Sequence, residues 1–150
     1  MEYHVEQIEL TERPTAVVRG LVAEEQIPDF LGGVFAEVME VIQAQGRQPG
    51  GMPFGCYVPT ANGVEIEAGF PTSAAVTPTG RVVASSLPGG PAIRVLHKGP
   101  YDAVTAAYDA AEAWLVDSPW ESAGPPWEEY LDGPEVPEPR TVVYVPCRPR

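Results

Sequence analysis

The hydrophobic and polar positions of the chain change period several times, and each change predicts a new element. A loose alternation in residues 2–10 predicts a first strand, and the apolar, β-branched residues 15–23 predict a second. Residues 27–46 then change to the three- and four-residue spacing of a helix, which Gly46 is expected to end. The apolar face of this helix consists of Leu31, Val34, Phe35, Val38, Val41 and Ile42.

The rest of the chain is punctuated by prolines and glycines, which is typical of many short strands. The Asn62-Gly63 pair between two apolar runs is a hairpin signal. The alanine-rich residues 101–118 predict a second helix, whose apolar face includes Tyr108 and Leu115. The remaining predicted strands cover residues 52–59, 63–71, 81–87, 91–99, 125–131 and 140–146.

The two halves of the chain follow the same pattern at an offset of 73 residues. We therefore predict an internal duplication of a β-β-α-β-β-like unit, at about residues 1–73 and 80–150, within a single α+β domain. Its antiparallel sheet would carry two main helices on one face, related by a pseudo-twofold axis. A central groove between the helices is a usual place for a ligand. The matched pairs are Phe35 with Tyr108, Ile42 with Leu115, Phe54 with Trp127 and Tyr57 with Tyr130.

Charge and residue counts narrow the function classes. Nine basic and 21 acidic residues give a formal net charge of −12, which disfavours nucleic acid and anionic membranes as partners. No apolar run reaches the length of a membrane span and no signal-peptide pattern occurs, so a cytoplasmic protein is expected. The two cysteines and two histidines are widely separated, so we expect no disulfide framework, metal site or cofactor. His97 lacks an evident orienting partner for catalysis and is expected to be a strand-end residue.

The strand predicted for residues 125–131 contains two adjacent glutamates. The first repeat has Gly55 and Cys56 where the second has Glu128 and Glu129. Because the fold would make similar demands on both repeats, this asymmetry favours a functional role for the carboxylates. No histidine has a spacing that would make Cys56 a nucleophile, so a small buried residue is expected there.

Strand alternation separates the two carboxylates. Glu128 is expected to share its face with Tyr130, whereas Glu129 shares its face with Trp127 and is expected to be exposed to solvent. In the first repeat, Gly55 has no side chain and would leave room for a ligand. From the residues alone, a ligand site and a solvent-facing position explain Glu128 equally well.

Three segments, "HKGPYDAVTAAYDAAEAWL", "GPPWEEYL" and "RTVVYVP", resemble the GyrI-like small-molecule-binding family. The domain of this family also forms the effector-binding part of BmrR-type multidrug regulators. The resemblance implies two βαββ-type repeats with a concave groove, and the binding of bulky, often cationic, aromatic compounds. It also implies that the buried pocket carboxylate of the family corresponds to Glu128. The chain has no room for a helix-turn-helix segment, so a stand-alone member is expected rather than a direct regulator of transcription.

A buried carboxylate is unfavourable when charged, and a lipophilic cation between aromatic rings would offset that penalty. We therefore predict a multidrug-binding protein that sequesters or senses lipophilic aromatic cations at about micromolar affinity. The alternative is a hydrolase that opens strained rings of alkylating compounds, with Glu128 activating water and Tyr130 or Tyr57 donating a proton. A third hypothesis is a protein–protein interaction module. Besides Glu128, the candidate ligand-binding residues, each of which taken singly is better explained as core, are Phe35, Phe54, Tyr57, Tyr108, Trp114, Trp127, Tyr130 and Tyr144.

Overall fold

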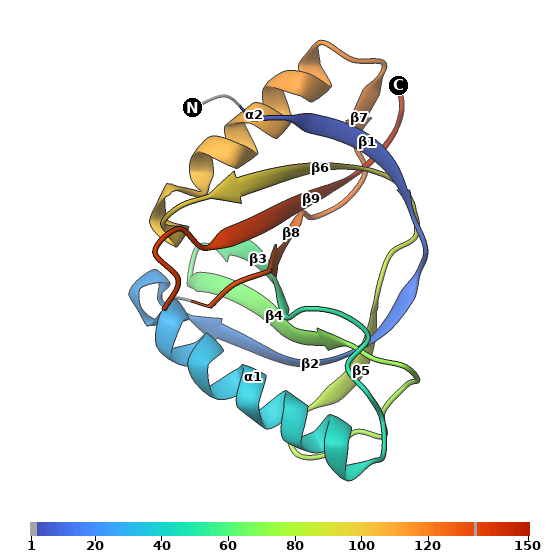
Figure 1. Cartoon of the computed structure of the whole chain (residues 1–150), viewed down its shortest axis with the longest axis vertical. Coiled ribbons are helices and arrows are strands. Elements are labelled where there is room, and N and C mark those ends of the chain that lie inside the picture. The colour runs from blue at the N-terminus through green and yellow to red at the C-terminus, as the bar shows by residue number, and fades with distance from the viewer. Residues whose placement is uncertain (1–2, 134) are drawn as a thin grey trace. The chain divides into compact units, whose positions relative to one another are not determined.

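The protein is described by a computed structural model that covers residues 3–133 and 135–150. It has an α+β fold in which two main helices pack on antiparallel strands, as the sequence predicts. The chain divides into two compact units, which Figure 1 shows in colours that run along the sequence. We name them after their helices: the α1 unit is Glu12–Pro88, and the α2 unit combines Met1–Thr11 with Gly89–Arg150.

The α1 unit contains four antiparallel strands in the order β3-β4-β2-β5. Its helix, α1, covers Ile27–Ala44 and follows a 3-10 turn at Glu24–Gln26. The helix lies along β2 and β4 (Figure 1). The strands are β2 (Arg13–Val22), β3 (Phe54–Thr60), β4 (Gly63–Pro71) and β5 (Val83–Leu87).

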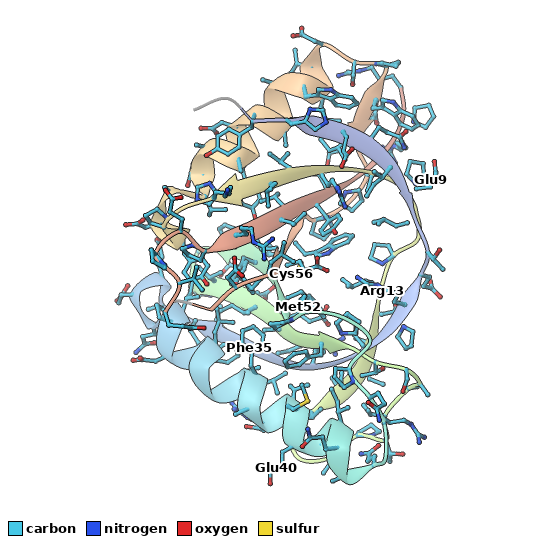
Figure 2. The ribbon with its side chains drawn as sticks, viewed as in Figure 1. Glu9, Arg13, Phe35, Glu40, Met52 and Cys56 are labelled. Atoms are coloured by element: carbon cyan, nitrogen blue, oxygen red, sulfur yellow. The ribbon has the colours of Figure 1, made fainter. Side chains whose placement is uncertain are left out.

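One face of α1 is fully buried against this sheet. Phe35 flanks the buried face and packs edge-on against Phe70 of β4, with ring centroids 5.8 Å apart, whereas Glu40 projects away from the strands (Figure 2). Residues four apart along a helix lie on one side, so the predicted apolar spacing is what buries this face. The buried residues are Val34, Val38 and Ile42.

Two glycines mark boundaries of elements in the α1 unit where the sequence predicts them. Gly46 has a φ of +70°, and its N–H donates to the carbonyl of Gln43 at 3.0 Å. The N–H of Arg47 reaches back to the carbonyl of Ile42, also at 3.0 Å, which completes a Schellman motif. Gly63, with a φ of +135°, closes the predicted β3–β4 hairpin.

The α2 unit contains four antiparallel strands in the order β1-β6-β9-β8, and a short strand, β7, pairs with the end of β9. Its helix, α2, covers Thr105–Val116 after a 3-10 turn at Tyr101–Ala103. The small side chains of Ala107 and Ala111 let α2 pack closely on the sheet. The sequence did not predict β7. The strands are β1 (Val5–Leu10), β6 (Gly90–Lys98), β7 (Trp120–Ser122), β8 (Trp127–Tyr130) and β9 (Arg140–Pro149).

The two units share one topology, because β3-β4-β2-β5 in the first corresponds to β8-β9-β6-β1 in the second. This match requires an exchange of edge strands: β1 pairs with β6 rather than β2, and β5 pairs with β2. Each compact unit therefore takes one edge strand from the other half of the chain. The equal strand orders support the internal duplication, which stays a prediction together with the pseudo-twofold axis and the central groove.

Neither helix of the described residues is long and apolar enough to cross a membrane.

Candidate functional site

β8 places its two adjacent glutamates on opposite faces of the sheet in the α2 unit. Glu128 pairs with Val143, a core residue beneath α2, so its side chain lies on the helix-covered face. Glu129 pairs with Val142 and lies on the other face. The two carboxylates are neighbours in sequence, but the pleat gives them different surroundings, as strand alternation predicts.

Glu128 accepts hydrogen bonds from two tyrosine hydroxyls. Tyr108 of α2 donates to Oε2 at 2.6 Å, and Tyr130, two residues along β8, donates to Oε1 at 3.1 Å. Burial raises the pKa of Glu128 above its ordinary value, while the two hydrogen bonds, from Tyr108 first and then from Tyr130, oppose the rise. Among the described residues, no Lys or Arg forms an ion pair with Glu128. The result is a half-buried carboxylate held by neutral donors.

Tyr101 adds a third ring to this face, although the sequence pattern did not predict it as a site residue. Its ring packs edge-on against Tyr130, with centroids 5.9 Å apart and an interplanar angle of 85°. Its hydroxyl donates to the backbone carbonyl of Asp132 at 2.8 Å. Tyr101 is the last residue of the "HKGPY" segment, which carries part of the family resemblance. This position, directly before the helix, is the sequence feature that could have identified it as a site residue.

His97 is buried, and it has the partners that the sequence did not reveal. Nε2 lies 2.9 Å from the carbonyl of Pro100, and Nδ1 lies 3.0 Å from the hydroxyl of Tyr3. A carbonyl only accepts, so Nε2 carries a proton, and in the neutral ring Nδ1 accepts from Tyr3. The expectation that His97 lacks an orienting partner is therefore wrong. Its contacts fix the turn that leads into Tyr101.

The α1 unit has a tyrosine in the position that corresponds to Tyr130. There, Tyr57 folds back over Gly55: a Cβ built on Gly55 would lie 2.5 Å from the Tyr57 hydroxyl. The space that a missing side chain was expected to leave for a ligand is therefore filled by Tyr57 itself. In the α2 unit the same fold-back brings Tyr130 onto the carboxylate of Glu128, because this position carries a side chain that can accept a hydrogen bond.

The other candidate aromatics lie elsewhere in their units. Trp127 stacks on Tyr144 with centroids 5.3 Å apart, and both lie on the sheet face that α2 does not cover. Trp114 packs against the core beneath α2. In the α1 unit, Phe54 is 1% exposed and Phe35 packs against the core. Within the α2 unit the structure thus brings two of the predicted aromatics, Tyr108 and Tyr130, to Glu128.

Glu129 is half-buried and lines an open cavity of about 410 Å³ on the face away from α2. Leu96 and Val142 also line this cavity, as do Arg94 and Glu6, which form an ion pair. The expectation of a simply solvent-facing Glu129 is therefore incomplete.

Cys56 is a poor candidate for a nucleophile. Burial, with a smaller effect from the charge of Glu67, raises the pKa of its thiol to about 11, so the reactive thiolate is scarce at neutral pH. Within the described residues no group of three or more His, Cys, Asp or Glu side chains could hold a metal ion.

These features define an α+β domain with two helices on antiparallel strands and a half-buried acidic group. Residues 1–148 match the family described as the GyrI-like small molecule binding domain. The chain therefore belongs to the GyrI-like family, as the sequence resemblance predicts.

Solved structures with the same fold include a domain of EcmrR, a protein that was also solved in a complex with DNA. The C-terminal domain of EcmrR matches with a TM-score of 0.86 and 20% identity, over 100% of both chains. The EcmrR–DNA complex matches with a TM-score of 0.82 and 22% identity, over 99% of this chain, which spans only 58% of the EcmrR chain. At these identities the likeness shows the fold alone.

Two further solved structures with this fold are named differently, one by a bound ligand and the other as a hydrolase. SAV2435, solved bound to tetraphenylphosphonium, matches with a TM-score of 0.64 and 16% identity, over 99% of this chain and 94% of that one. A hydrolase from Listeria innocua matches with a TM-score of 0.67 and 13% identity, over 96% of this chain and 91% of that one. No protein of curated function matches the chain significantly.

Proposed function

We propose that this protein binds lipophilic aromatic cations and that Glu128 holds their positive charge. One observation carries the proposal. The half-buried Glu128 carboxylate accepts hydrogen bonds from two tyrosine hydroxyls, but no Lys or Arg of the described chain forms an ion pair with it. An ionised carboxylate away from water is unfavourable without an opposite charge. A ligand cation would supply that charge and lower the pKa of Glu128 towards its ordinary range.

The rings around Glu128 suit an organic cation better than a metal ion. Tyr108, Tyr130 and Tyr101 present phenol rings on the same face, and a cation over such a ring gains roughly 0.5–2 kcal/mol. Ring contacts and a single charge discriminate poorly between molecular shapes. We therefore expect broad specificity, which fits a role in sequestering or sensing drug-like compounds.

The fold relatives supply the probe. SAV2435 shares this fold and was solved with tetraphenylphosphonium, a lipophilic cation with four aromatic rings. Calorimetric titration of this protein with tetraphenylphosphonium should give a dissociation constant of about micromolar size, near −8 kcal/mol. Triphenylphosphine oxide, which has similar rings but no net charge, is the matched ligand control and should bind much more weakly.

Substitution of the two glutamates of β8 separates the ionic contribution from the packing contribution. Glu128→Gln keeps the size of the side chain but removes its charge, and should weaken tetraphenylphosphonium binding at least tenfold, or about 1.4 kcal/mol. Glu129→Gln removes a charge from the opposite face and should leave the affinity unchanged. Equal affinities for the wild type and the Glu128→Gln variant would show that Glu128 does not hold the cation.

A hydrolase is the second candidate, and the raised pKa of Glu128 favours it, since a carboxyl group that titrates nearer neutrality is a better general base. Glu128 would take a proton from water, whose oxygen attacks a strained ring, and Tyr130 would protonate the leaving atom. Mass spectrometry distinguishes the two functions. A hydrolysed compound gains the mass of one water, whereas a bound ligand is recovered unchanged.

A further inference from the structure

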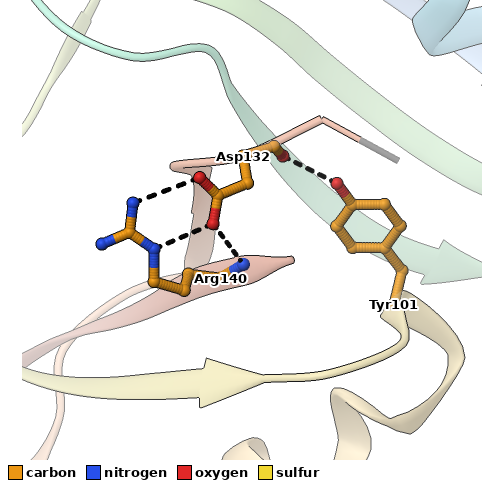
Figure 3. Close-up of polar contacts among 3 residues, drawn as sticks. All are labelled: Tyr101, Asp132 and Arg140. Atoms are coloured by element: carbon orange, nitrogen blue, oxygen red, sulfur yellow. Dashed lines mark hydrogen bonds and ion pairs between the residues drawn. The ribbon is translucent and has the colours of Figure 1, made fainter. Parts of the chain in front are cut away.

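The loop that joins β8 to β9 is closed at its base by one ion pair. The guanidinium of Arg140 donates to both carboxylate oxygens of Asp132, at 2.8 and 3.1 Å, and the backbone N–H of Arg140 donates to the same carboxylate at 3.0 Å (Figure 3). The N–H of Leu131 also donates to the carbonyl of Arg140, at 3.1 Å. These four bonds fix the backbone of Asp132.

The fixed carbonyl of Asp132 is the acceptor for Tyr101, which comes from a different part of the α2 unit (Figure 3). The 2.8 Å bond joins the turn before α2 to the loop after β8. Burial, with smaller effects from the charges of Glu135 and Asp132, raises the pKa of Tyr101, so its hydroxyl stays protonated and able to donate at neutral pH. A second bond, from the N–H of Gly99 to the carbonyl of Pro139 at 3.0 Å, ties the same two segments.

Tyr101 connects the backbone of Asp132 to the carboxylate of Glu128 through the ring of Tyr130. Its ring meets the ring of Tyr130 edge-on, and the hydroxyl of Tyr130 donates to Glu128 at 3.1 Å. The contacts form a continuous series from the Arg140–Asp132 ion pair to the half-buried Glu128. Its members in order are Arg140, Asp132, Tyr101, Tyr130 and Glu128.

The Arg140–Asp132 pair is too exposed for its main effect to be on global stability. The Arg140 side chain is 48% exposed, and ion pairs open to solvent contribute little to global stability. The bidentate geometry of the pair, however, holds the orientation of Asp132 more firmly than a single hydrogen bond could.

We propose that Asp132 and Arg140 are positioning residues that, through Tyr101, hold the hydroxyl of Tyr130 on Glu128. The inference concerns the same site as the proposed function and rests on it for its biological meaning. Its physical content is independent of any ligand, because it predicts how substitutions of Tyr101 and Arg140 change the titration of Glu128.

The first test is a double-mutant cycle read by carboxyl NMR titration of Glu128 in the ligand-free protein. Tyr101→Phe removes only the hydroxyl that reaches Asp132, and Arg140→Met removes the ion pair. Each should raise the pKa of Glu128, because the Tyr130 hydrogen bond that lowers it becomes less populated. The double variant should show no further rise, since both changes release the same contact.

Two further variants keep this test decisive. Arg148→Met removes the Arg148–Glu121 pair, another exposed ion pair of the same unit, and should leave the titration of Glu128 unchanged. Arg140→Lys keeps the charge but loses the two-pronged geometry, and replaces Arg140→Met if that variant fails to fold. Single variants without effect on the titration, or effects that add fully in the double variant, would overturn the proposal.

The second test uses tetraphenylphosphonium. Tyr101→Phe and Arg140→Met should each weaken its binding about fivefold, which corresponds to one lost hydrogen bond. If the wild type does not bind this cation, the proposed function fails, while the NMR cycle still decides whether the loop positions Glu128. If binding is normal but the cycle shows no coupling, the positioning proposal alone fails.

Discussion

The hydroxyl of Tyr108 on α2 donates a hydrogen bond of 2.6 Å to Oε2 of Glu128 on β8. This bond joins the helix to the sheet of the α2 unit. The strength of this bond depends on whether Glu128 is ionised, because a carboxylate is a stronger acceptor than a neutral carboxyl group.

Tyr108→Phe should therefore destabilise the protein more at high pH than at low pH. A hydrogen bond to a charged group typically contributes about 1.5–3 kcal/mol, and a loss in this range is expected at pH 8. At pH 4, where Glu128 is protonated, the loss should be smaller. Urea denaturation at both pH values measures the difference. Tyr130→Phe, which removes the longer 3.1 Å bond, should show the same trend with smaller losses.

Glu128→Gln should stabilise the protein at pH 8. Burial raises the pKa of Glu128, so the folded state binds more protons than the unfolded state between the ordinary pKa and the raised one. This contribution to stability is complete below the ordinary pKa and is lost as the pH rises through the raised value. The gain from Glu128→Gln, measured as Tm, should consequently shrink as the pH falls towards 4, and a gain independent of pH would contradict the assignment.

The affinity for tetraphenylphosphonium should rise with pH. A cation binds the ionised form of Glu128, and protonation competes with it, so binding strengthens as the pH passes upward through the raised pKa. Titration at pH 4 and pH 8 measures this change, because pH 4 lies below even the ordinary pKa of a glutamate. Glu128→Gln should abolish the pH dependence between these values, and a persistent dependence would point to another titrating group.

Gly69→Ala should be strongly destabilising, although the new side chain is only a methyl group. A Cβ at Gly69 would lie 1.9 Å from the backbone carbonyl oxygen of Ala16, so the β2–β4 pairing would have to shift. We expect a loss of about 3 kcal/mol in denaturant unfolding, at the upper end of overpacking effects. Gly33→Ala is the matched control: it lies on the exposed side of α1 with open space around it, and should stabilise by about 0.5–1 kcal/mol.

Cys56 should react slowly with iodoacetamide in the native protein. With a pKa of about 11, its thiolate fraction at pH 8 is far below that of an unperturbed cysteine, so alkylation should be about 100-fold slower. Mass spectrometry of the native and the urea-denatured protein measures the ratio. Rapid native alkylation of Cys56 would contradict the raised pKa of its thiol.

The elements were predictable from sequence because their information is local. The apolar spacing of α1, the positive φ of Gly46 and the hairpin at Gly63 each depend on a few consecutive residues. β7 was missed because its three residues are too few to show a period, and it exists only through pairing with β9. The exchange of the edge strands β1 and β5 could not be predicted either, because the residues of a strand do not specify which strand it pairs with.

The candidate site shows the same division. Strand alternation alone separated Glu128 from Glu129 and put Tyr130 beside Glu128. No pattern could show that Tyr57 fills the space over Gly55, because that outcome depends on the direction in which a ring folds back.

The sequence by itself determined the fold class, the family and the residue most important to the proposed function. It did so through periodicity and short motifs, which are properties of neighbouring residues. Only the tertiary structure decided which side chains meet that residue. Tyr108 and Tyr130 reach Glu128, Trp127 and Tyr144 turn to the opposite face, and Tyr101 approaches from the turn before α2. These contacts join segments distant in the chain, and their geometry is set by strand register and packing, which no local pattern encodes.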